Sequence, residues 1–145
     1  MQLTVRELNR QYGRTPALWS ADHDPAGFTW LEGGAAQENL LAFVRHAAAG
    51  HDDGRDLVCL THLSGVARQG FRLGVPSAGQ WEVVLDTSEA AFAREAADAA
   101  EQDALLAGRQ GHALTAEATP WHGQEHSVVV NVPALSTLWL RPVQD

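Results

Sequence analysis

Seven histidines make a metal site the first chemistry to consider in this chain of 145 residues. The nearest pair, His122 and His126 in HGQEH, would have the spacing of two zinc ligands only on a helix, where residues four apart share a face. Pro120 before the pair, Gly123 inside it and strand-like residues after it predict a turn instead. We therefore expect His122 to be a hydrogen-bonded turn residue, and we expect no metal and no cofactor.

Three other side chains could act as a nucleophile or a base. Ser64 lacks the flanking glycines of a nucleophile elbow. His62 lies in an apolar strand-like segment, so we expect a buried histidine with its hydrogen bonds satisfied. Cys59 lies in the same segment and is predicted to be a small buried residue rather than a reactive thiol. As the single cysteine it excludes an internal disulfide and fits a reducing, cytoplasmic location.

The acidic residues are the remaining candidates for catalysis. They fall in a turn near residue 22, in a Gly- and Asp-rich loop, and in an alanine-rich segment that favours a helix. Such positions are typical of turn-forming residues and of a solvated helix face, so we assign no catalytic residue. The acidic side chains considered are Asp22, Asp24, Asp52, Asp53, Asp56, Glu89, Glu95, Asp98, Glu101 and Asp103.

Composition excludes two classes of partner. A net charge of -8 argues against nucleic-acid binding, because neutralising phosphates requires a basic face. No apolar run approaches the roughly 20 residues that span a membrane, and the N-terminal MQLTVRELNR lacks the hydrophobic stretch of a signal peptide.

The spacing of apolar residues predicts a mainly β fold. Residues 3–12 fit a helix with Val5, Leu8 and Tyr12 on one face. The segment from 86 to 111 fits an inserted surface helix over about 88–108. Eight short strand-like segments separated by turn residues argue for an antiparallel β-sandwich of the Greek-key type. The expected strands are 28–32, 39–45, 57–63, 71–75, 81–87, 112–118, 126–132 and 137–141.

Residues 22–32, DHDPAGFTWLE, should form a fixed joint between the helix and the first strand. Pro25 restricts the backbone at its own position and at Asp24. The two aspartates of this stretch can accept bonds from downstream N–H groups, and Gly27 gives a backbone position that a side chain would block.

That joint resembles the one in glycogen branching enzymes, where the last helix of the catalytic barrel passes into a C-terminal all-β domain. Segments 57–87, 120–135 and 138–142 resemble the family in the same order, so the resemblance covers nearly the whole chain. It implies that residues 1–21 are the last barrel helix and that residues 22–145 are the C-terminal β-sandwich domain. The alanine-rich segment departs from the family, whose corresponding loop is rich in Gly and Asn.

The resemblance also implies a function. The whole enzyme would cut an α-1,4-glucan and re-join the piece through an α-1,6 bond, using two carboxylates about 5 Å apart at the ends of barrel strands. This chain has no barrel strands, so we expect it to be inactive alone. Its expected partners are the catalytic barrel, through Val5, Leu8 and Tyr12, and α-glucan.

Tryptophans are the candidates for glucan binding, because glucose rings stack their C–H faces on aromatic side chains. The candidate substrate-binding residues are Trp121 and His122 in the predicted turn, and Trp81 after another turn. Trp139 and Trp30 are expected in the core. A free-standing carbohydrate-binding or interaction module is the alternative function, and the tail of another α-amylase relative is a third possibility.

Overall fold

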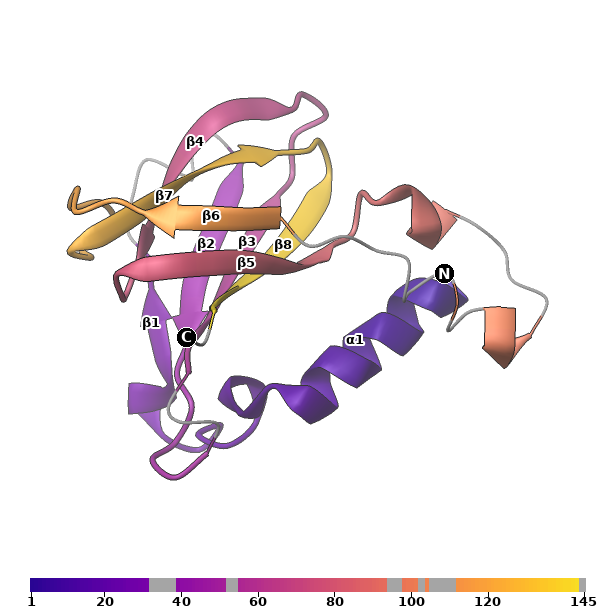
Figure 1. Ribbon diagram of the computed structural model, residues 1–145, viewed down its shortest axis with the longest axis horizontal. Coiled ribbons are helices and arrows are strands. Elements are labelled where there is room, and N and C mark those ends of the chain that lie inside the picture. The colour runs from indigo at the N-terminus through magenta and orange to yellow at the C-terminus, as the bar shows by residue number, and fades with distance from the viewer. Residues whose placement is uncertain (32–38, 52–54, 94–97, 102–103, 105–111, 144–145) are drawn as a thin grey trace.

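The computed structural model describes residues 1–31, 39–51, 55–93, 98–101, 104 and 112–143 (Figure 1). The long helix α1 spans Gln2–Arg14 and so extends through Gly13, beyond the predicted range of 3–12. Short 3-10 helices η1 (Pro16–Leu18), η2 (Pro25–Gly27) and η5 (Ala90–Ala93) accompany it. The strands in the described residues are β1 (Phe28–Trp30), β2 (Leu40–Arg45), β3 (Leu57–His62), β4 (Arg68–Val75), β5 (Gly79–Asp86), β6 (His112–Ala116), β7 (His126–Val132) and β8 (Ser136–Pro142).

The strands form two antiparallel sheets, as predicted. The larger has the order β1-β2-β3-β8-β5-β6, and the smaller pairs β4 with β7. Placing β8 between β3 and β5 gives the non-sequential order that is expected of a Greek-key-type sandwich. A single bridge between Glu117 and Ser127 joins the end of the β6 segment to β7 and so links the sheets at one corner.

Alternate residues of each strand face the space between the sheets and form the main core. Its largest fully buried side chain is Trp81 on β5. From the larger sheet the core takes Leu40, Ala42, Val44, Val58, Leu60, Trp81, Val83, Leu138 and Leu140, and from the smaller sheet Phe71, Leu73, Val75, Val128, Val130 and Val132.

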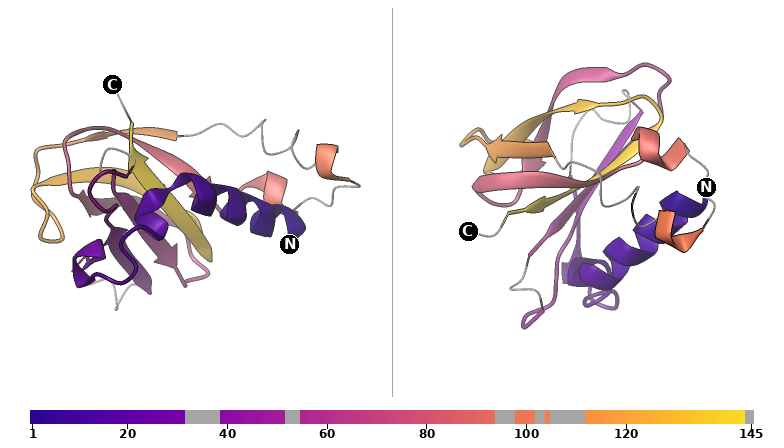
Figure 2. Two further views of the ribbon diagram at one scale, coloured as in Figure 1. Left: turned by 90° about the horizontal axis from the view of Figure 1, so that it is seen from below. Right: turned by 45° about the vertical axis from the view of Figure 1, so that its right-hand side comes forward.

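Helix α1 lies across the outer face of the larger sheet (Figure 2). Leu3 is buried there with Leu85, and Leu8 packs beside them. A polar contact adds to this apolar one: the fully buried Glu7 carboxylate accepts from Gln11 Nε2 at 2.7 Å, and the same amide nitrogen donates to the Val84 carbonyl of β5 at 3.3 Å. The helix is therefore fixed to the sheet along one side.

Two of the contacts predicted for the joint, those of Asp24 and Gly27, are found between η1 and β1. Asp24 Oδ1 accepts from the Ala26 amide at 2.9 Å and caps η2. A Cβ at Gly27 would lie 2.5 Å from the Ala21 carbonyl oxygen, so only glycine fits. The carboxylate of Asp22 pairs with the Arg45 guanidinium on β2. These contacts hold the entry to the sandwich in one conformation.

Part of the predicted inserted helix over 88–108 lies outside the described residues, namely 94–97, 102–103 and 105–108. Within the described part, Asp86 Oδ1 accepts from the Ser88 amide at 2.9 Å, and η5 follows. Phe92 of η5 is buried against Leu3 and Leu85. The start of the insertion therefore packs on the N-terminal end of α1.

Candidate functional site

Trp121 lies at the tip of the hairpin between β6 and β7, in the turn that the sequence predicted. Its amide and carbonyl both pair with Gln124, at 3.0 and 2.9 Å, and His122 and Gly123 between them have φ of 50° and 73°. This is the geometry of a two-residue hairpin turn. The Trp121 side chain is 47% exposed and could meet a ligand.

His122 is a hydrogen-bonded turn residue, as predicted. Its Nδ1 accepts from the Gly74 amide of β4 at 3.1 Å. The imidazole also lies beside two other rings, Phe71 with centroids 5.9 Å apart and Trp121 with centroids 6.2 Å apart. These contacts fix the turn on the smaller sheet and orient Trp121.

Trp81, the third candidate for glucan contact, is a core residue. None of its surface is exposed, and its indole N–H donates to the Ser77 carbonyl at 3.1 Å. A sugar ring has no access to it in this fold, so Trp81 is excluded as a glucan contact.

A cluster of three aromatic rings, the exposed Phe28 and Trp30 and the partly buried Phe43, was missed in the sequence. We had expected Trp30 in the core, and this prediction is wrong, since its side chain is 62% exposed. On β1 it is Thr29 and the following Leu31 that turn inward, which places Phe28 and Trp30 on the outer face. Both sets of alternate positions hold large apolar residues, so the alternation alone could not choose between them.

The outward side of α1 is also exposed. Val5 and Tyr12 are half exposed, and the indole N–H of Trp19 donates to the Tyr12 carbonyl at 3.0 Å, which adds a third apolar side chain. Leu8, which we had expected on this side, is partly buried with Leu3 and Trp139 on the sheet. We call Val5, Tyr12 and Trp19 the helix face.

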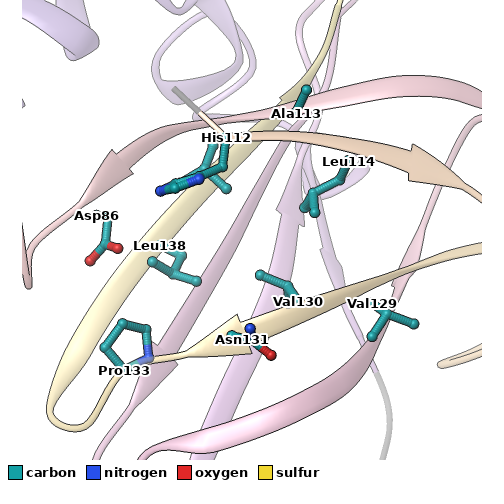
Figure 3. A pocket seen from close by; sticks show the side chains of 10 residues that line it. Asp86, His112, Ala113, Leu114, Val129, Val130, Asn131, Pro133 and Leu138 are labelled. Atoms are coloured by element: carbon teal, nitrogen blue, oxygen red, sulfur yellow. The ribbon is translucent and has the colours of Figure 1, made fainter. Parts of the chain in front are cut away.

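A pocket of about 510 Å³ opens between the two sheets where β6 and β7 separate (Figure 3). Its floor is aliphatic, with Leu114, Val130 and Leu138 among the residues that line it. Figure 3 shows Asp86 and His112 on one side of this space. Asp86 is its single lining carboxylate among the described residues, so this pocket lacks the pair of facing acids that glycoside cleavage requires.

A second polar arrangement has the order of a catalytic triad. Thr29 Oγ1 lies 2.8 Å from His46 Nε2, and His46 Nδ1 lies 2.8 Å from Asp56 Oδ1. None of the three lines the pocket just described. The residues come from β1, from the end of β2 and from the start of β3, so we interpret the arrangement as a tie across three neighbouring strands.

Among the residues that the structure describes, no three His, Cys, Asp or Glu side chains group closely enough to hold a metal ion. No helix in the described part of the chain is both long and apolar enough to cross a membrane.

Cys59 of β3 is buried, as predicted, and packs against Ala17 of η1, so we expect it to be unreactive. Burial raises the pKa of its thiol to about 12, and the nearby Arg45 guanidinium only partly offsets this rise. Because the thiolate is the nucleophile, the native protein at pH 8 should react with iodoacetamide on the order of 10³-fold more slowly than a free thiol of pKa about 8.5. Reaction in urea gives the reference rate, and equal rates in both states would contradict the burial.

Residues 30–143 match the family described as alpha amylase, C-terminal all-beta domain. The chain belongs to this family. The matched range starts at Trp30 and includes seven complete strands, β2 to β8, whereas α1 and the joint precede it.

Relatives of this C-terminal all-β domain extend the similarity to α1. Three proteins named 1,4-alpha-glucan branching enzyme illustrate it. That of Burkholderia vietnamiensis is 40% identical over 142 residues, which is 98% of this chain and 17% of the relative. That of Kitasatospora aureofaciens is 39% identical over 95% of this chain and 16% of the relative. That of Thermobifida fusca is 40% identical over 97% of this chain and 17% of the relative. The chain thus spans about a sixth of the length of the relatives it matches.

Proposed function

We propose that this chain is the C-terminal domain of a 1,4-α-glucan branching enzyme, an enzyme that would transfer α-1,4-glucan segments to form α-1,6 branches during glycogen synthesis. The observation that carries the proposal is the similarity to branching enzymes over 142 of the chain's residues, which must include most of α1 and the joint. The family match alone covers only 30–143 and is shared with other α-amylase relatives.

The domain's own task, in this proposal, is to brace the catalytic barrel. Helix α1 would be the last helix of that barrel, held between the barrel on one side and the six-stranded sheet on the other. Two features support this: its inward side is fixed by Leu3, Glu7 and Gln11, and its outward side keeps Val5 and Tyr12 exposed. A free-standing module has no need for the apolar residues of that outward side.

The proposal gives catalysis to the rest of the enzyme and a glucan contact to the turn at Trp121. The exposed indole and the adjacent His122 offer a stacking surface and a hydrogen-bonding group. The proposed location is the cytoplasm, for which the single free Cys59 is the support.

A branching assay tests the proposal. The isolated chain should form no α-1,6 branches when incubated with amylose. Grafted into the Thermobifida fusca branching enzyme in place of the matching region, it should restore branching that is lost when that region is removed. Branch formation by the isolated chain, or an inactive graft in a folded enzyme, would refute the proposal.

A further inference from the structure

We propose that Phe28, Trp30 and Phe43 form an aromatic platform that binds an α-1,4-glucan chain, separately from the turn at Trp121. The ligand class rests on the function proposed above. The support for the site itself is the arrangement of the rings, their exposure and their polar neighbours.

The three rings support one another in a fixed arrangement. Phe28 stacks on Phe43 with centroids 5.1 Å apart and planes 25° apart. Trp30 stands nearly perpendicular to both, at 82° and 5.1 Å from Phe28 and at 79° and 6.0 Å from Phe43. Edge-to-face and offset-stacked contacts of this kind are favourable, so the exposed indole is held in place before a ligand arrives.

The platform lies at the β1 edge of the outer face of the six-stranded sheet. Farther along that face, Ala17 of η1 packs on Leu57 and Cys59, and α1 packs on β5 and β8. At the β1 edge Phe28 and Trp30 remain exposed, whereas Phe43 is partly buried against the Ala17, Leu57 and Cys59 cluster and supports them from below. Leu41 on β2, two residues before Phe43, is 46% exposed on the same side of the strand.

Polar groups border the rings, which suits a sugar better than it suits a purely apolar surface. Phe28 is the cross-strand partner of Arg45, whose guanidinium pairs with the exposed Asp22 carboxylate. A pyranose ring has an apolar C–H face and a rim of hydroxyl groups. The indole of Trp30 can cover that face while the charged pair binds hydroxyls.

The glucan class follows from the relatives, whose printed names refer to 1,4-alpha-glucan. A polymer with many equivalent sugar rings can bind two surfaces of one domain at once. The second contact is then intramolecular, so the overall affinity exceeds that of either surface alone. The platform also has the more exposed indole, with Trp30 at 62% and Trp121 at 47%.

Titration with maltoheptaose, followed by the indole N–H signals of the tryptophans in NMR, tests the platform on the chain as it stands. The Trp30 signal should shift, and Trp30→Ala should weaken binding about tenfold. Leu41→Ala removes apolar surface from the same face without an aromatic ring and should leave the affinity within about twofold. Because Trp30 is exposed, Trp30→Ala should keep the chemical shifts of the core residues.

The outcomes separate this proposal from the preceding one. Equal binding by wild type and Trp30→Ala refutes the platform, while loss on Trp121→Ala alone would leave the turn as the glucan contact. Absence of any maltoheptaose binding refutes the platform as well, whereas the amylose assay on the graft still decides the branching function. If Trp30→Ala abolishes activity of the graft without any effect on maltoheptaose binding, the rings contact protein, and the platform is again refuted.

Discussion

Replacing Trp81 with alanine should lower the free energy of unfolding by about 3–5 kcal/mol, because the substitution empties the centre of the sandwich. Trp81 has no exposed surface and packs with Leu138, Leu140 and the inward residues of β4 and β7. The change also removes the donor to the Ser77 carbonyl. Urea unfolding followed by circular dichroism measures the loss.

Trp121→Ala is the matched control for Trp81→Ala. It removes the same side chain from a position that is 47% exposed, so the loss should stay below about 1 kcal/mol. Similar losses for the two substitutions would contradict the assignment of Trp81 to the core and of Trp121 to the surface.

Gly74→Ala should cost about 3 kcal/mol and displace the turn that carries Trp121. A Cβ at this position would lie 2.2 Å from the Trp121 carbonyl oxygen and 2.9 Å from His122 Cβ. Since the nearest atom belongs to the backbone, the clash can be relieved only by moving β4 away from the hairpin. That movement would also break the bond from the Gly74 amide to His122 Nδ1.

Gly65→Ala controls for the loss of a glycine as such. A Cβ there meets no atom within 4 Å, so the free energy of unfolding should change by less than about 0.5 kcal/mol. Urea unfolding of both variants, with the indole N–H signal of Trp121 recorded beside it, measures the two effects. A stable Gly74→Ala protein with an unmoved Trp121 signal would contradict the close approach.

The elements of this fold could be predicted because their patterns are local. β3 reads as LVCLTH, apolar on both faces, since one face meets the core and the other meets η1. The turn at Trp121 could be predicted because Gly123 favours a turn and strand-like residues come after this segment. The helix runs through Gly13, beyond the predicted residue 12, because α1 gains tertiary contacts with the sheet through Leu3 and Gln11, and such contacts override helix propensity.

Which side of a strand faces inward was not a local property. Phe28 and Trp30 alternate with Thr29 and Leu31, and the inward set is decided by the pairing of β1 with β2, where Thr29 lies opposite the buried Val44. For the same reason, the sequence alone could not decide whether Trp81 faces the core or a ligand. The tie of Thr29, His46 and Asp56 depends on the pairing of β1, β2 and β3, because its members are 17 and 10 residues apart and meet only when these strands are side by side.

Branching activity of the graft into the Thermobifida fusca enzyme, compared with and without charges on the helix face, tests the central claim most directly. Val5→Glu combined with Tyr12→Glu changes two half-exposed positions, so the isolated chain should keep its stability. In the graft this pair should abolish most α-1,6 branch formation, because carboxylates would be forced against the barrel. Val129→Glu, an exposed position on the smaller sheet, should leave it unchanged. Full branching by the doubly charged graft would contradict the claim that this domain braces the barrel through α1.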